Sequence, residues 1–117
     1  MQRNFKKYSL LLLLVSGITF FNPVGAQSDS THQFIDIKTS AICNSCKKTI
    51  ETALKKVDGV ESANLNVQTK VVTVLYDVHK TNPDNIRLAI SKSGYDADDV
   101  PADKDAYDHL DSCCKKE

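Results

Sequence analysis

The hydrophobic pattern between residues 34 and 100 changes its period several times, and the order of these changes restricts the chain to few folds. Residues 34–39 alternate apolar and polar side chains, which is typical of a strand with one buried face. Apolar side chains then recur at i, i+3, i+4 and i+7 within residues 43–57, and Gly59 follows them. This spacing predicts a loop that leads into a helix.

The second part of the pattern begins with two runs rich in β-branched residues, at 60–67 and 71–76. A short turn at residues 68–69 separates them, so we predict an antiparallel hairpin. The Asn-Pro-Asp sequence at 82–84 supplies a helix cap, a first-turn proline and an acidic first turn. The helix that starts there ends before a weaker final strand, predicted at 95–100.

The expected order is therefore strand, helix, strand, strand, helix, strand. A four-stranded antiparallel sheet with two helices on one face satisfies this order. The predicted fold class is α+β, in the ferredoxin-like βαββαβ arrangement, over residues 34–100. Residues 101–117 form an acidic, cysteine-containing tail, for which we predict one helical turn at 106–110.

Residues 1–26 have the features of a secretory signal peptide. Three basic residues precede an apolar run at 10–21, and no acidic residue appears before Asp29. This run of 12 residues is shorter than the roughly 20 that a membrane-spanning helix needs, which disfavours an uncleaved anchor. We predict cleavage near Ala26, followed by a flexible polar leader at 27–33. The mature protein would then work outside the cytoplasm, in the periplasm, where conditions are oxidising.

The charges of the chain exclude one large class of partner. Fifteen Lys and Arg residues balance fifteen Asp and Glu residues, so nothing in the net charge supports binding to nucleic acid. The four cysteines are the unusual part of the composition, and we expect them to carry the function.

The first two cysteines lie in the sequence Cys43-Asn44-Ser45-Cys46, between the predicted first strand and first helix. Two thiols at this spacing can converge on one ion, and we expect both to lie on a loop outside the core. With Ser45 as the predicted helix cap, Cys46 enters the first turn, where the positive helix end and neighbouring Lys47 favour thiolate. Thiolates select soft ions such as Cu(I), Hg(II), Zn(II) or Cd(II). Two ligands suit an exchangeable ion better than a closed zinc site.

Residues 34–100 resemble a heavy-metal-associated domain. The family includes copper chaperones, modules of metal-transporting P-type ATPases and periplasmic mercury-binding proteins. The resemblance rests on Ser-Ala-Ile-Cys-Asn-Ser-Cys at 40–46, Val-Asp-Gly-Val at 57–60, Val-Thr-Val-Leu-Tyr-Asp at 72–77 and Ser-Gly-Tyr-Asp-Ala at 93–97.

This resemblance implies that Cys43 and Cys46 bind the ion. The family usually has Gly-Met-Thr before its first cysteine, whereas this chain has Ser40, Ala41 and Ile42. The family's methionine packs beneath the loop, so Ala41 gives a smaller support.

We therefore predict an exported, non-enzymatic protein that binds one soft metal ion per domain, of the Cu(I) or Hg(II) class, either to deliver it or to sequester it. The expected partner is a membrane metal transporter or another metal-binding domain, and we expect a monomer without a membrane anchor. The alternative is a small periplasmic thiol–disulfide oxidoreductase, because such enzymes have the same cysteine spacing at a helix start. This chain is short for that fold and has no tryptophan.

Cys113 and Cys114 lie in the tail, outside the region of resemblance. Neighbouring cysteines rarely pair with each other, because that disulfide is strained. About 13 residues separate Val100 from Cys113, so an extended tail could reach ~40 Å. We predict that the tail folds back and that Cys113 or Cys114 joins Cys43 and Cys46. The alternative is a mobile tail whose thiols bind metal separately or form an intermolecular disulfide.

Overall fold

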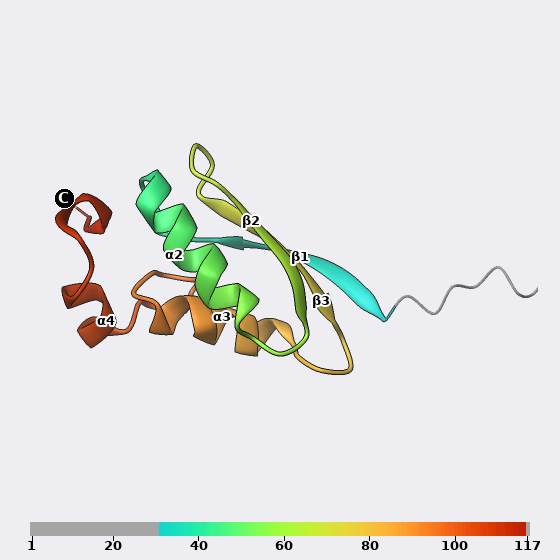
Figure 1. Ribbon diagram of the computed structural model, residues 1–117. Helices are drawn as coiled ribbons and strands as arrows, with labels where there is room; N and C mark the ends of the chain where they lie inside the picture. The colour runs from blue at the N-terminus through green and yellow to red at the C-terminus, as the bar shows by residue number, and fades with distance from the viewer. Residues whose placement is uncertain (1–30, 117) are drawn as a thin grey trace, which may run out of the picture.

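The computed structural model describes residues 31–116, so the predicted signal peptide at 1–26 and residues 27–30 of the predicted leader lie outside the described residues. The order of elements matches the predicted order up to the second helix (Figure 1). The elements are β1 His32–Lys38, α2 Asn44–Lys55, β2 Val60–Asn66, β3 Val71–Asp77, α3 Pro83–Lys92, α4 Lys104–Asp108 and a 3₁₀ turn, η2, at Ser112–Cys114.

The three strands form one antiparallel sheet in the order β1-β3-β2, and α2 and α3 pack on one side of it (Figure 1). β3 is the central strand, and its Val74 pairs with Ile35 on one side and with Ala63 on the other. Phe34 is 71% exposed, as expected for the sheet face that no helix covers. The predicted hairpin and the α+β class are confirmed.

The core lies between the sheet and the two helices. The side chains that face it alternate along each strand, as the period-two pattern predicts. Each helix contributes side chains from one face, three or four residues apart. The fully or almost fully buried members are Ile37, Leu65, Val72 and Val74 from the strands, and Ile50, Leu54, Ile86 and Ile90 from the helices.

The predicted fourth strand is reduced to isolated bridges that pair Ala97 with Thr39 and with Val100. The reason is a tight turn, in which Asp98 takes a positive φ of 51°. The N–H of Asp98 donates to the carbonyl of Lys38, and the Asp98 carboxylate accepts from the N–H of Lys38. Asp98 thus forms hydrogen bonds with both backbone groups of Lys38 at the end of β1. The chain turns there, so the predicted strand at 95–100 does not form along β1.

The other boundaries differ from the predictions by a few residues. β1 begins at His32, so residues 32–33 belong to the sheet and not to the expected leader. Asn82 caps α3 by accepting from the N–H of Asn85, as predicted. The helical turn of the tail is α4, two residues earlier than expected. Within residues 31–116, no helix is both long enough and apolar enough to cross a membrane.

Candidate metal centre

The loop between β1 and α2 carries the first two cysteines, and Thr39 fixes its start. The Thr39 hydroxyl donates to the carbonyl of Lys70 at 2.8 Å and accepts from the N–H of Ala41 at 3.2 Å. Ala41 is completely buried, and it gives the loop the smaller support that was expected in place of the family's methionine. These contacts tie the loop to the end of the hairpin and fix where α2 begins.

The helix cap is Cys43, and the prediction that Ser45 caps the helix is wrong. Cys43 has an extended backbone, with φ −150° and ψ 171°, and its carbonyl accepts the first helical hydrogen bond from Lys47. The helix therefore starts at Asn44, which places Ser45 inside the first turn. The Cys43 side chain lies directly at the positive end of α2, where a thiolate is stabilised.

The structure brings the four predicted cysteines together. The sulfur of Cys43 lies 3.0 Å from that of Cys46, 3.4 Å from that of Cys114 and 4.0 Å from that of Cys113. The sulfurs of Cys113 and Cys114 are 3.8 Å apart. All four are free thiols. Of the two alternatives for the tail, the structure has the one in which it folds back onto the loop.

The four thiols differ in exposure. Cys46 is completely buried and belongs to the core, which corrects the expectation that both motif side chains lie outside it. Cys114 is 4% exposed, Cys43 is half-buried and Cys113 is exposed. The cluster therefore has one thiol at the surface, one half-buried and two inside the protein.

The same environment shifts the pKa values of these groups. The pKa of Cys43 is lowered, first by the hydrogen bond with the Cys46 side chain and then by the nearby backbone N–H of Cys46. The pKa of Cys114 is raised, chiefly because the thiol is buried. Lys47, expected to favour thiolate, instead pairs with Glu51 and donates to the carbonyl of Leu65. Cys43 is thus the thiol best prepared to bind an ion first.

Tyr95 lies beside the buried thiols of Cys46 and Cys114. It is completely buried, and its hydroxyl has no hydrogen-bond partner among the described residues. Burial raises the pKa of Tyr95 strongly, and the Cys114 and Cys46 side chains raise it further. Its hydroxyl is therefore a neutral donor next to two sulfur atoms.

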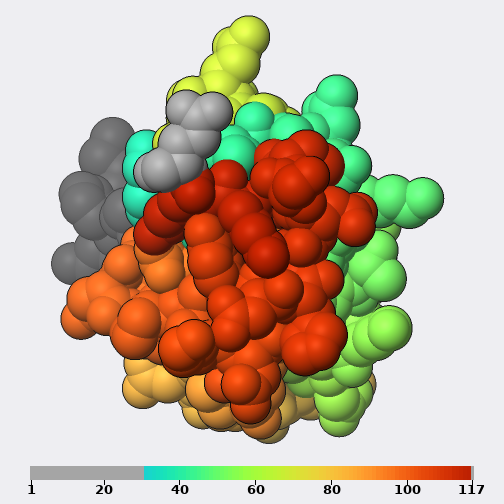
Figure 2. All heavy atoms as spheres, turned by 90° about the vertical axis from the view of Figure 1, so that its left-hand side faces the viewer, coloured from blue at the N-terminus to red at the C-terminus, as the bar shows by residue number. Residues whose placement is uncertain are grey.

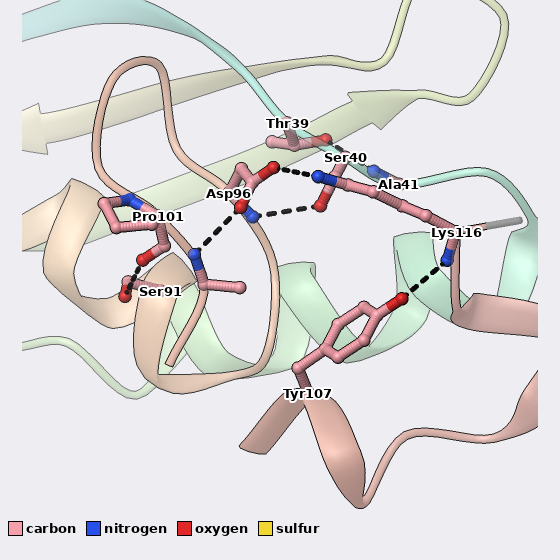
Figure 3. A network of polar contacts seen from close by, with 9 residues as sticks. Thr39, Ser40, Ala41, Ser91, Asp96, Pro101, Tyr107 and Lys116 are labelled. Atoms are coloured by element: carbon pink, nitrogen blue, oxygen red, sulfur yellow. Dashed lines mark hydrogen bonds and ion pairs between the residues drawn. The ribbon is translucent and has the colours of Figure 1, made fainter. Parts of the chain in front are cut away.

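The tail is held over the loop by polar contacts that centre on Asp96 (Figure 3). Lys116 forms an ion pair with the Asp96 carboxylate, and the N–H of Lys116 donates to the Tyr107 hydroxyl at 2.9 Å. The N–H of Asp96 donates to the hydroxyl of Ser40, in the metal loop, at 2.9 Å. The Asp96 carboxylate also accepts from the N–H of Ala102. The tail thus covers one face of the molecule (Figure 2).

Comparison with known proteins identifies relatives of the central region. Residues 40–96 match the profile of the heavy-metal-associated domain. The "Copper chaperone CopZ" of Staphylococcus aureus (strain JH9) is 41% identical over 54 residues, which cover 46% of this chain and 79% of that protein. The matched range of the family ends before the cysteines of the tail.

Solved structures show the same fold. The water-soluble region of the P-type ATPase CopA from Bacillus subtilis superposes with a TM-score of 0.54 and 36% identity, over 56% of this chain and 44% of that one. Oxidized MerP from Ralstonia metallidurans CH34 superposes with a TM-score of 0.54 and 25% identity, over 56% of this chain and 93% of that one. The sheet and the two packed helices are therefore a shared scaffold, while η2 and its cysteines lie beyond residue 96.

Proposed function

The chain belongs to the heavy-metal-associated domain family, and on that premise we propose that it binds one soft metal ion through Cys43 and Cys46 and passes it to another protein. The observation that carries this proposal is the pair of sulfurs 3.0 Å apart at the positive end of α2. The helix end favours the thiolate form of Cys43, whose pKa is lowered, and thiolate is the form that binds soft ions.

Cu(I) is the proposed ion. The identity to a protein named as a copper chaperone supports it, and so does the preference of thiolates for Cu(I). Hg(II) is the second candidate, supported by the likeness to a structure named MerP. Zn(II) and Cd(II) also bind thiolates, and they serve as competitors in the test below.

The proposed partner is a membrane metal transporter with a domain of this same fold, which the likeness to a P-type ATPase region supports. Transfer proceeds by ligand exchange, in which a thiolate of the partner binds the ion while Cys43 releases it, and Cys46 follows. No bond other than those to the ion forms or breaks, so the function is binding and delivery without catalysis.

The proposed location is the periplasm, after cleavage near Ala26. Its support is the basic start, the apolar run and the small residues within 1–26. In an oxidising compartment, the ion would also protect Cys43 and Cys46 from forming a disulfide, because the ion occupies the thiolates.

Anaerobic titration with Cu(I), in competition with a coloured chelator, tests the proposal. We expect one Cu(I) per chain in the native protein and at least a tenfold lower affinity in Cys43→Ser. Ser45→Ala is the matched control, because it alters an exposed side chain between the two cysteines, in the first turn of α2, and leaves all thiols in place. Unchanged affinity in Cys43→Ser would overturn the proposal. Reduction of a protein disulfide by the metal-free chain would favour the oxidoreductase alternative instead.

A further inference from the structure

The two tail cysteines lie outside the family region, yet they are placed against its metal loop. The matched domain ends at residue 96, and η2 carries Cys113 and Cys114 back to the start of α2 (Figure 1). Cys114 is 71 positions from Cys43 in the sequence, and their sulfurs are 3.4 Å apart. The chain therefore offers more thiols at this point than a Cys-x-x-Cys pair supplies.

The spacing of the sulfurs fits metal coordination. Three of them, from Cys43, Cys113 and Cys114, lie within 4.8 Å of one another. A metal–sulfur bond of about 2.3 Å places tetrahedral ligand sulfurs ~3.8 Å apart. The separations of 3.4, 3.8 and 4.0 Å are close to this value, whereas the sulfurs of Cys43 and Cys46, 3.0 Å apart, must move apart to bind the same ion. Small movements of the side chains would therefore place three or more sulfurs around one ion.

A second observation points to a ligand at the same place. The hydroxyl of Tyr95 is completely buried beside Cys46 and Cys114, and it has no hydrogen-bond partner within residues 31–116. A buried hydroxyl without a partner destabilises the fold, because it has lost its hydrogen bonds to water and gained none in return. A thiolate that binds an ion can accept a hydrogen bond from this hydroxyl, because its sulfur retains lone pairs.

We propose that Cys113 and Cys114 join Cys43 and Cys46 as ligands, so that the folded tail turns an open two-thiolate site into a closed thiolate cage for one soft ion. This inference rests on the proposed function, which needs only the first pair. It deepens that function by giving the site a retaining state, with the tail closed, and a transferring state, with the tail open.

Asp96 acts as the latch of the cage. Its carboxylate pairs with Lys116, two residues beyond Cys114, and its N–H donates to Ser40, three residues before Cys43 (Figure 3). One residue thus connects the segment that carries the tail thiols to the loop that carries the first pair. Loss of the Lys116 ion pair frees the tail without removing any thiol.

Cys113 is the first sulfur that the thiolate of a partner meets when it removes the ion from the closed site. It is exposed and lies in a hollow of about 440 Å³. Lysines 70, 115 and 116 also line this hollow, so it attracts an anionic thiolate of an incoming partner. Such a thiolate reaches Cys113 first, and the buried sulfurs of Cys46 and Cys114 follow once the tail has moved.

X-ray absorption of the full chain loaded anaerobically with one Cu(I) counts the sulfur neighbours directly. We expect three or more in the native protein, and two in the double variant Cys113→Ser/Cys114→Ser. The double variant should bind Cu(I) at the same stoichiometry with at least a tenfold lower affinity. Ser112→Ala is the matched control, because it alters the same turn and keeps both thiols. Only two sulfur neighbours in the native protein would overturn the inference, whether or not the variant folds.

Release of Cu(I) to an excess of a thiol chelator tests the latch. Lys116→Ala keeps all four cysteines, and we expect it to release the ion at least threefold faster than the native chain. An unchanged release rate would refute the role of the ion pair. The two proposals fail separately, because absence of binding in the native chain refutes the proposed function, whereas binding by two sulfurs refutes only the cage.

Discussion

Gly94→Ala should open the tail by a steric route that touches no cysteine. Gly94 follows α3 with a φ of +104°, a backbone conformation that an alanine adopts only with strain of about 1–3 kcal/mol. An added Cβ would lie 3.1 Å from the carbonyl carbon and oxygen of Ala106 and 3.1 Å from the side chain of Leu110. Both residues belong to the segment that leads to η2, so the new methyl group pushes the tail away from the domain.

The size of the effect follows from the strain. A loss of about 2 kcal/mol lowers the melting temperature of a domain of this size by ~8–16 °C. Displacement of the tail should also raise the hydrogen exchange of residues 104–116 and speed the release of Cu(I). Both can be measured on the full chain, by exchange mass spectrometry and by chelator competition.

Gly59→Ala is the control, because Gly59 also has a positive φ, +98°, and an added Cβ there would meet Lys80 at 2.7 Å, not the tail. It should lower the melting temperature and leave the exchange of residues 104–116 unchanged. Native values of tail exchange and Cu(I) release in Gly94→Ala would mean that the close contact with Ala106 and Leu110 does not hold the tail in place.

Three further predictions concern the cysteines and the latch. Cys46→Ser should destabilise the metal-free chain by about 1–3 kcal/mol in thermal unfolding, because it buries a hydroxyl in the core, whereas Cys43→Ser should cost less. Lys116 lowers the pKa of Asp96, so this carboxylate stabilises the closed tail fully above its unfolded pKa of about 3.9. That contribution is up to about 1 kcal/mol for a partly exposed pair. It is lost as the pH falls through the lowered folded pKa of Asp96. The hydrogen exchange of residues 104–116 should therefore rise in acid in the native chain, and it should rise less in Asp96→Asn. Bound Cu(I) should slow disulfide formation between Cys43 and Cys46 in air, and equal thiol loss with and without the ion would contradict this.

Local sequence signals were sufficient for the elements that form the domain. The hairpin is predictable because apolar residues alternate on both of its strands, as at Leu65 and Val72, which pair in the sheet. The second helix is predictable because the Asn82 cap and the proline after it act within one turn. These signals depend on neighbours in the sequence, so they persist in the fold.

The predictions that differed depend on contacts between distant residues. The composition of residues 95–100 predicts an extended strand. In the structure, Asp98 forms a hydrogen bond with the end of β1, 60 positions earlier, and the chain turns there. The start of the helix depends on the loop that Thr39 fixes through its hydrogen bonds. Cys43 therefore occupies the cap position, although serine, as at Ser45, is the better capping residue. No local pattern contains either contact.

The same distinction applies to the site. The Cys43 and Cys46 pair is recognisable from its spacing and from its place between a strand and a helix. The return of the tail was one of two open alternatives, because chain length permits it but does not require it. The contacts that favour it, between Lys116 and Asp96 and between Leu110 and the core, exist only once the domain has folded.

Alkylation of the cysteines with and without one equivalent of Cu(I), read residue by residue by peptide mass spectrometry, tests the central claim most directly. We predict that Cu(I) protects Cys43 and the exposed Cys113 from alkylation, whereas Cys46, which is already buried in the metal-free chain, changes little. Alkylation of Cys43 at the same rate in both samples would contradict the claim that this loop binds the ion.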